Sequence, residues 1–267
     1  MTRPIIKWAG GKTQLLEQLV PLIPDDYGTY YEPFLGGGAL FFAVQPHHAV
    51  INDYNPSLIN LYKQVKKNPE ELMKELDTLT LGHSPDGDYY YERREEYNLS
   101  LKMNTKDIRQ AALFIYLNKA GYNGLYRLNS DGLYNVPNGK RKNLNLYDRD
   151  NILNVSRILK HARIQCGDFE KSCKDAKAGD FVFFDSPYYN TYDAYKAGGF
   201  AQEDHVRLSR LFAELTAKGV KCLLTNSNEK YIKELYKDYD IKIVDVKRMI
   251  NCDGKKRTGK EVIIKNY

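Results

Sequence analysis

The sequence predicts an α/β fold in which helices cover both faces of a mostly parallel sheet and a mostly helical block is inserted. Three observations support this prediction. Short β-branched or aromatic runs alternate with helical stripes near both ends of the chain, as in parallel sheets. Consecutive helix-like segments replace that alternation between about residues 55 and 160. The length of 267 residues, 42% of them hydrophobic, is sufficient for one large domain with an insertion.

Seven short runs have the length and composition of buried strands. In chain order they are TYYEPF (29–34), HAVIND (48–53), ARIQCGD (162–168), DFVFFD (180–185), VKCLLTN (220–226), IKIVDVK (241–247) and EVIIKN (261–266). The polar link 251–259 between the last two has no helical stripe, which predicts a hairpin at the edge of the sheet. A helix is expected to end near Gly219, and its apolar stripe consists of Leu208, Leu211, Phe212 and Leu215.

The inserted block contains four helix-like segments, at 56–67, 69–79, 90–101 and 106–119. They are followed by GYNGLYRLNSDGLYNVPNGK (121–140). In this stretch Ser130, Asp131 and Gly132 form a good turn sequence between two short alternating runs, which predicts a β-hairpin. We therefore expect residues 1–54 and 161–267 to form one domain and residues 55–160 to form a second.

The charge distribution favours an anionic partner. The net charge is +6, and six basic residues but only one acidic residue fall between Lys247 and Lys260. The stretch GKRKN at 139–143 adds a second basic cluster. Two solvated surface segments are the alternative, because charge runs usually face water.

Several classes of protein are disfavoured. No apolar stretch approaches the roughly 18 residues of a membrane span, and the amino terminus lacks the apolar core of a secretion signal, so a cytoplasmic location is expected. The four cysteines and five histidines do not follow metal-ligand spacing, and no metal is expected. Gly11, Lys12 and Thr13 match the end of a P-loop, but Ile6 occupies the position of its first glycine, so this motif fails.

The stretch EPFLGGGALFF (32–42) follows an expected strand and indicates a ligand-binding loop. Its glycines let the backbone approach a ligand closely, but Phe41 stands where the dinucleotide fingerprint requires a third glycine. Asp53 lies 17 residues after Gly36, at the end of the next expected strand, where a carboxylate can bind ribose hydroxyls. A simple turn role for Asp53 is the alternative. The pattern favours an adenosine-bearing cofactor without a tight pyrophosphate cradle, and S-adenosylmethionine fits that description.

The stretch FFDSPYYN (183–190) brings a carboxylate to the end of an apolar strand. In open α/β sheets this edge faces the ligand, so Asp185 is expected to face the cofactor. Pro187 restricts Ser186 and fixes the direction of the Ser186 carbonyl, so the chain presents two acceptors for one amino group. That arrangement suits methylation of an exocyclic amine, and Tyr188 can stack on the base. An ordinary strand-end turn is the alternative.

These motifs, in this order, resemble the Dam-like adenine-N6 DNA methyltransferases. The residues that carry the resemblance are KWAGGK (7–12), YEPFLGGGALFF (31–42), residues 118–140, CGDF (166–169), DSPYY (185–189), residues 198–208 and GKEVIIKNY (259–267). The resemblance implies a Rossmann-like methyltransferase sheet with an inserted target-recognition domain that carries a β-hairpin. Ser186 departs from the family's usual Asp-Pro-Pro-Tyr. Because the backbone carbonyl has the expected role there, activity should survive with a looser turn.

The resemblance also implies roles for individual residues. At the cofactor site it implies Trp8, Lys12, Pro33, Phe34, Gly36, Gly38, Asp53, Asp168, Phe169 and Asp185. For the flipped target adenine it implies Asp185, Ser186, Pro187 and Tyr188, and for DNA contacts Lys7, Tyr122, Asn123, Leu125, Arg127, Pro137 and Lys140. The expected reaction is transfer of a methyl group from S-adenosylmethionine to the N6 amine of an adenine in duplex DNA, in GATC or a GAT-containing site.

Two other functions stay open from the sequence. An RNA or protein amine methyltransferase could use the same cofactor fold, and a catalytically silent DNA-binding homologue could carry Ser186. The expected partner is double-stranded DNA, bound by a monomer, and a cognate restriction endonuclease that acts separately is a further candidate.

Overall fold

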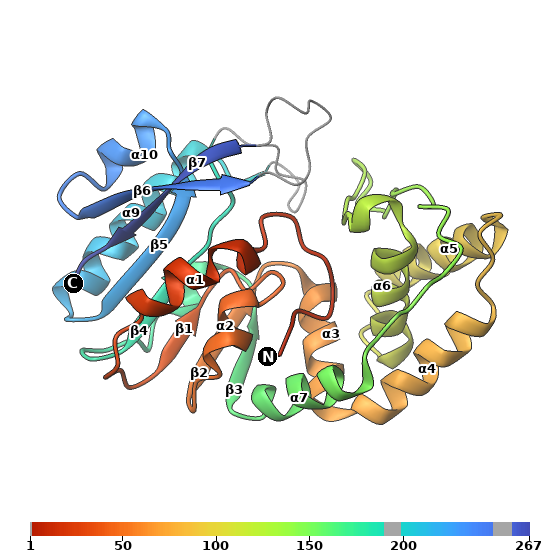
Figure 1. Ribbon diagram of the computed structural model, residues 1–267. Coiled ribbons are helices and arrows are strands. Elements are labelled where there is room, and N and C mark those ends of the chain that lie inside the picture. Colours follow the sequence, from red (N-terminus) through yellow and green to blue (C-terminus); the bar gives the residue numbers. More distant parts are fainter. Residues whose placement is uncertain (1, 190–198, 248–257) are drawn as a thin grey trace.

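A computed structural model describes residues 2–189, 199–247 and 258–267 and shows a seven-stranded mixed sheet beside a group of helices (Figure 1). The order of strands in the sheet is β3-β2-β1-β4-β5-β7-β6. The strands are β1 (Tyr30–Glu32), β2 (Ala49–Asp53), β3 (Ala162–Cys166), β4 (Phe181–Phe184), β5 (Lys221–Ser227), β6 (Asp240–Lys247) and β7 (Thr258–Lys265). Every strand expected from the sequence is therefore confirmed.

The helices lie between the strands in chain order. They are α1 (Leu16–Leu19), α2 (Ala39–Val44), α3 (Pro56–Lys67), α4 (Pro69–Leu81), α5 (Asp88–Lys102), α6 (Ile108–Ala120), α7 (Arg149–Leu159), α8 (Phe169–Ser172), α9 (Gln202–Ala217) and α10 (Lys230–Leu235). Three short 3₁₀ helices are η1 (Lys12–Leu15), η2 (Val20–Leu22) and η3 (Tyr122–Gly124). Within the described residues, no helix has both the length and the hydrophobicity that crossing a lipid bilayer requires.

Strands β1 to β5 pair in parallel, whereas β7 runs antiparallel between β5 and β6. Pairing between β6 and β7 extends from Asp240 opposite Lys265 to Lys247 opposite Thr258, which confirms the expected hairpin at the edge of the sheet. The basic link between these strands, residues 248–257, lies outside the described residues. The carboxyl ends of β1, β2 and β4 meet at one edge, where the sequence places its glycine-rich loop, Asp53 and Asp185.

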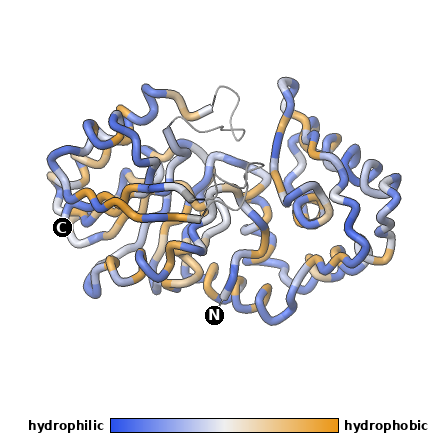
Figure 2. The backbone as a smooth tube through the Cα atoms, turned by 45° about the horizontal axis from the view of Figure 1, so that its top comes forward, coloured by the Kyte–Doolittle hydropathy of each residue, from blue (hydrophilic) through white to orange (hydrophobic). Residues whose placement is uncertain are grey.

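The two faces of the sheet bury different side chains, because alternate residues of a strand point to opposite sides. In β4, Phe181 and Phe183 join the core that includes α1 to α6, whereas Val182 and Phe184 join a second core with α8, α9 and α10. In the tube view, hydrophobic stretches follow the strands inside the sheet (Figure 2). Helices thus cover both faces, as the sequence predicts.

The four helix-like segments of the inserted block form α3 to α6. Together with the segment 121–147 they make up what we call the helical lobe, on the right of Figure 1. Helix α6 is buried almost all round, from Gln110 to Asn118, so it forms the centre of this lobe. Asp107 begins the helix by accepting a hydrogen bond from the Gln110 amide at 2.8 Å.

The hairpin expected within 121–140 is present only in part. Its two arms meet at isolated antiparallel bridges, Gly121 to Asn138 and Leu128 to Tyr134. The arms bond each other on either side of Tyr134, whose own backbone groups therefore point away from the opposite arm. There buried Asn98 accepts a hydrogen bond from the Tyr134 amide at 2.8 Å and donates one to its carbonyl at 3.2 Å. Backbone groups satisfied in this way do not need a continuous partner strand.

Helix α7 ends the block between β2 and β3, and the sequence analysis did not identify it. Asp148 caps it by accepting from the Asn151 amide at 3.0 Å, and its buried stripe includes Ile152, Val155 and Leu159. The helix packs against α3, α4 and β3. The N-cap and the stripe were both visible in the sequence and could have predicted the helix.

Candidate active site

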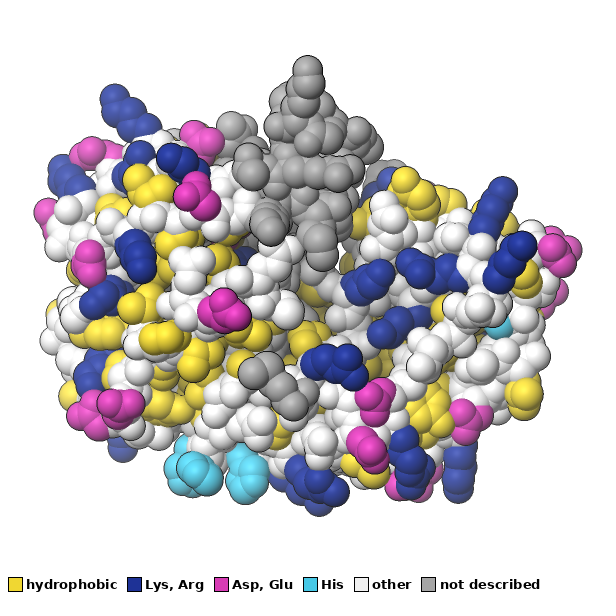
Figure 3. Space-filling model, viewed as in Figure 1, with side chains coloured by type: hydrophobic (Ala, Val, Ile, Leu, Met, Phe, Trp, Pro, Cys, Tyr) yellow, Lys and Arg dark blue, Asp and Glu magenta, His cyan; other side chains and the backbone are white. Residues whose placement is uncertain are grey.

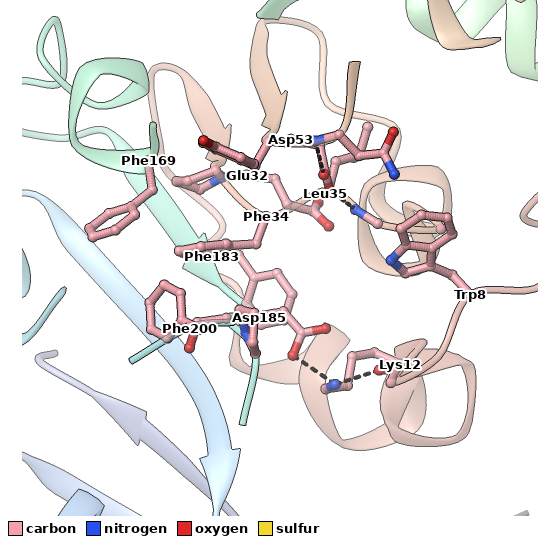
Figure 4. A pocket seen from close by; sticks show the side chains of 18 of the residues that line it. Trp8, Lys12, Glu32, Phe34, Leu35, Asp53, Phe169, Phe183, Asp185 and Phe200 are labelled. Atoms are coloured by element: carbon pink, nitrogen blue, oxygen red, sulfur yellow. Dashed lines mark hydrogen bonds and ion pairs between the residues drawn. The ribbon is translucent and has the colours of Figure 1, made fainter. Parts of the chain in front are cut away.

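A cavity of about 400 Å³ opens at the carboxyl edge of the sheet, within the size range of small-molecule sites. It is lined by the loops that follow β1, β2, β3 and β4 and by residues 8–12. Figure 4 shows Asp53 and Asp185 extending from neighbouring loops, with Trp8 on one side and Phe169 and Phe200 on the other. All the residues expected at the cofactor site line this cavity.

The glycine-rich loop after β1 has a left-handed backbone at Gly36 (φ +50°) and Gly38 (φ +69°). A Cβ atom at Gly36 would lie 2.7 Å from Cδ1 of Trp8. Space and backbone conformation therefore both require glycine at this position. The indole of Trp8 also stacks on Tyr126 of the helical lobe, with ring centroids 5.7 Å apart.

Asp53 ends β2 and joins two loops at the edge of the sheet. Its Oδ2 accepts a hydrogen bond from the Gly36 amide at 2.8 Å, and its Oδ1 accepts one from the Asn55 amide at 2.9 Å. Burial raises the pKa of Asp53 to about 6, although both of these hydrogen bonds oppose the shift. The carboxylate is held in place at the cavity wall.

Three phenylalanines form an aromatic end to the cavity. The ring of Phe34 lies 5.2 Å from that of Phe169 and 5.8 Å from that of Phe200. Arg207 of α9 covers the Phe169 ring at 4.8 Å and donates a hydrogen bond to Asp168 at 2.9 Å. No sequence pattern indicates Phe200 or Arg207, because only the fold brings the start of α9 to this loop.

Asp185 follows β4 directly and is paired with Lys12. The Lys12 ammonium lies 2.7 Å from Asp185 Oδ1, and the Thr225 hydroxyl donates to the same oxygen at 2.7 Å (Figure 4 shows the ion pair). Lys12 is only 5% exposed, and it also lies over the Tyr188 ring at 4.7 Å. Burial raises the pKa of Asp185, and Lys12 opposes that shift. The lysine that fails as part of a P-loop therefore has a role beside this carboxylate.

Asp185 and the four residues that follow it form a turn, which we call the Asp185 turn (185–189). Ser186 is buried, and Pro187 and Tyr188 line the cavity with it. The Tyr188 hydroxyl donates to Glu261 of β7 at 2.6 Å, which orients the ring. No sequence pattern indicates this role for Glu261, since its position depends on the antiparallel insertion of β7.

Glu32 is a further cavity residue to which no role was assigned from the sequence. It ends β1, is buried at the cavity and accepts a hydrogen bond from the Tyr30 hydroxyl at 2.6 Å. Burial raises its pKa to about 8, and the nearby Asp185 and Asp53 contribute to the shift. An acid directly before the glycine loop was the signal that could have indicated it.

The residues expected to contact DNA lie apart from the cavity. Six of them are on the segment 121–140. Lys7 packs closely against that segment: a Cβ atom added at Gly124 would lie only 2.7 Å from Lys7 Cδ. Arg127 is half-buried and donates from Nε to Asn135 Oδ1 at 2.7 Å. Tyr122, Asn123, Pro137 and Lys140 are exposed, and Leu125 is half-buried. Lys and Arg side chains gather on the helical lobe in Figure 3.

No group of three or more His, Cys, Asp or Glu side chains that could hold a metal ion occurs among the described residues. A cavity with an aromatic end, three carboxylates and a glycine-rich loop at the carboxyl edge of parallel strands is typical of α/β proteins with nucleoside-type ligands.

Comparison with known proteins identifies the family. The sequence profile of the D12 class N6 adenine-specific DNA methyltransferases matches residues 8–250. The type II methyltransferase M1.LlaDCHI of Lactococcus lactis subsp. cremoris is 40% identical over 282 residues, which cover 99% of this chain and 95% of that protein. The type II methyltransferase M.MjaIII of Methanocaldococcus jannaschii is 39% identical over 287 residues, with 99% of both chains covered. The DNA adenine methylase of Escherichia coli (strain K12) is 29% identical over 270 residues, which cover 99% and 95%.

The chain belongs to the D12 class of N6 adenine-specific DNA methyltransferases. It is an enzyme that methylates adenine in DNA, and its relatives include type II methyltransferases. The resemblance seen in the motifs is thereby confirmed.

Proposed function

We propose that the enzyme transfers a methyl group from S-adenosylmethionine to the N6 amine of an adenine flipped out of duplex DNA, within GATC or another GAT-containing site. The observation that carries this proposal is the position of Asp185. Its carboxylate stands at the carboxyl end of β4, on the wall of the same cavity that contains Asp53 and the aromatic end.

The cavity fits S-adenosylmethionine in size and in chemistry. Its volume of about 400 Å³ lies in the range for such ligands, and Phe34 and Phe169 offer apolar surface for an adenine ring. Asp53 is fixed by two backbone amides and can accept hydrogen bonds from ribose hydroxyls. The other residues proposed to hold the cofactor are Trp8, Lys12, Pro33, Gly36, Gly38, Asp168 and Asp185. When bound, this cofactor supplies an electrophilic methyl group on a sulfonium.

The Asp185 turn would bind the target base. The N6 lone pair of adenine is conjugated with the ring, so it becomes a better nucleophile when its hydrogens are drawn toward two acceptors. Among the described residues, Lys12 and Thr225 both contact Oδ1 of Asp185, and Oδ2 is the oxygen that would accept one hydrogen of the amine. The Ser186 carbonyl would accept the other, while Tyr188 stacks on the base. Catalysis would come from positioning and electrostatics.

The helical lobe would recognise DNA. We propose that residues 55–160 form the target-recognition domain and that residues 1–54 and 161–267 form the catalytic domain. Lys7, Tyr122, Asn123, Leu125, Arg127, Pro137 and Lys140 would contact DNA. Arg127 would read a guanine edge, the commonest specific contact in the major groove. The basic residues of 139–143 would contact phosphates. The enzyme would act as a monomer, and a separate endonuclease of matching specificity is the proposed biological partner.

A transfer assay tests this function. Labelled S-adenosylmethionine is incubated with a duplex containing GATC, with the same duplex carrying N6-methyladenine at the site, with an unrelated duplex, and with RNA. We expect label in the first duplex alone, and no label with Asp185→Ala. Label in RNA alone, or no transfer to any DNA by the unaltered enzyme, would overturn the proposal. Sequencing of modified adenines in DNA from a methylation-free host then identifies the full site.

A further inference from the structure

The Asp185 turn must hold a carboxylate and a carbonyl in fixed directions, but its covalent structure restrains it only in part. Pro187 has a fixed φ and restricts the ψ angle of the residue before it. Ser186, the residue whose carbonyl is proposed to bind the base, has no ring to fix its own φ. Noncovalent contacts must therefore restrain this residue.

The end of β5 supplies those contacts. Strand β5 pairs in parallel with β4 up to Phe184 opposite Leu224, so the next residues of both strands remain side by side. The Thr225 hydroxyl donates to Asp185, and the Ser227 hydroxyl donates to the Tyr189 carbonyl at 3.0 Å. Strand β5 is therefore bonded to both ends of the turn.

Asn226, between these two residues, spans the turn with one amide group. Its Nδ2 lies 3.3 Å from Ser186 Oγ, and its Oδ1 accepts a hydrogen bond from the Tyr189 amide at 3.1 Å. The exposed fractions are only 1% for Asn226 and 2% for Ser186. Buried polar groups with satisfied partners are rigid, because breaking one contact leaves an unsatisfied group in a region without water.

Asn226 does not line the cavity, so it can affect the reaction only through the turn. We infer that Asn226 is a positioning residue, and that its bond to the Ser186 hydroxyl restrains the residue whose carbonyl receives the target amine. The inference rests on the proposed function for its effect on rate, whereas the order of the turn itself does not depend on substrate.

Two substitutions at Ser186 separate the hydroxyl from the restraint that it provides. Ser186→Ala removes the bond to Asn226 and leaves φ free. Ser186→Pro also removes the hydroxyl but fixes φ covalently. We expect Ser186→Ala to lower the single-turnover rate of methyl transfer about five- to tenfold, the factor for one buried hydrogen bond, with unchanged affinity for DNA. Ser186→Pro should slow transfer less than Ser186→Ala does, because its ring restores the restraint on φ.

The partner residue gives a second comparison. Asn226→Ala should slow transfer further than Ser186→Ala, because it also removes the contact to the Tyr189 amide. In that background Ser186→Ala should have no additional effect, since the two residues share one bond. Ser156→Ala is the matched control: it removes another buried serine hydroxyl, bonded to the Lys66 carbonyl on α3 far from the cavity, and should leave the rate unchanged.

Hydrogen exchange at the Tyr189 amide supplies a readout that needs no methyl transfer. We expect faster exchange in Ser186→Ala and Asn226→Ala, and exchange like that of the unaltered protein in Ser186→Pro. A normal rate and normal exchange in Ser186→Ala would overturn the inference. Equal slowing of methyl transfer in Ser186→Ala and Ser186→Pro would also overturn it. An unaltered enzyme that transfers no methyl group would instead count against the proposed function, and the exchange measurement would still decide the role of Asn226.

Discussion

The side-chain amide of Asn118 in α6 hydrogen-bonds both backbone polar groups of Lys7. The Lys7 amide donates to Asn118 Oδ1 at 2.9 Å, and Asn118 Nδ2 donates to the Lys7 carbonyl at 2.9 Å. Asn118 Nδ2 also donates to the Gly124 carbonyl at 2.8 Å. One buried side chain thus links the amino-terminal segment to the loop proposed to read DNA, next to Trp8 at the cavity.

Replacing Asn118 with alanine should loosen this link. Three hydrogen bonds to backbone groups are lost, so we expect destabilisation of about 1–3 kcal/mol and weaker binding to cognate duplex. Cofactor affinity should change less than DNA affinity, because Asn118 does not line the cavity. Thermal unfolding and titrations with duplex and cofactor measure these effects. Asn154→Ala on the surface of α7 serves as the control, and equal loss of DNA affinity in both variants would contradict the role of Asn118.

Replacing Lys12 with methionine should shift the pH dependence of transfer. Burial raises the pKa of Asp185 and Lys12 opposes that effect, so without the ammonium the pKa rises further. A protonated Asp185 is a poorer acceptor for the target amine. The acidic limb of the single-turnover rate should therefore move to higher pH, with a larger loss of rate in acid than at alkaline pH. An unchanged limb would show that Lys12 does not control the ionisation of Asp185.

Asp53 should make cofactor binding weaker in acid. Its pKa is about 6 in the folded protein, so below that pH it becomes protonated and binds ribose hydroxyls less well. The dissociation constant of S-adenosylmethionine should rise by up to about tenfold per pH unit below 6. Asp53→Asn should bind weakly with no such slope. Since the folded pKa lies above the ordinary 3.8, this group adds stability as the pH falls from about 6 towards 4. Its titration therefore does not weaken binding by unfolding the protein.

Gly36→Ala tests the contact between the glycine loop and Trp8. The new Cβ would meet the indole at 2.7 Å in a backbone with positive φ, so we expect a loss of about 2 kcal/mol or more in unfolding free energy, with weaker cofactor binding. Gly132→Ala is the matched control, because its φ is +74° but no atom lies within 4 Å of its Cβ. This control should lower the unfolding free energy by only about 1 kcal/mol. Equal losses in denaturant unfolding would exclude a steric role for Trp8.

The sequence predicted the strands and the two carboxylates at their ends because both follow from local pattern. Buried runs identify the strands, and parallel pairing brings Asp53 and Asp185 to one edge. The partners of these residues could not be predicted in the same way. Thr225 and Glu261 reach the Asp185 turn only because β5 and β7 pair in a particular register.

The segment 121–140 shows the opposite limit of sequence patterns. Its turn and alternation are typical of a hairpin, and backbone hydrogen bonds do join its two arms, but only at isolated bridges. On the outer side of the hairpin, Asn98 of α5 bonds both backbone groups of Tyr134, a contact across 36 positions that no local pattern indicates. Arg207 is a similar case, since its place at Asp168 depends on how α9 packs beside α8.

The antiparallel insertion of β7 has a consequence for biosynthesis. Strand β5 gains its second neighbour only when residues 258–265 have been translated, because β7 lies between it and β6. Until then a growing polypeptide on the ribosome would expose the hydrogen-bonding edge of β5 and lack the acceptor for Tyr188. Enzyme activity should therefore arise only after residues 258–265 have left the exit tunnel.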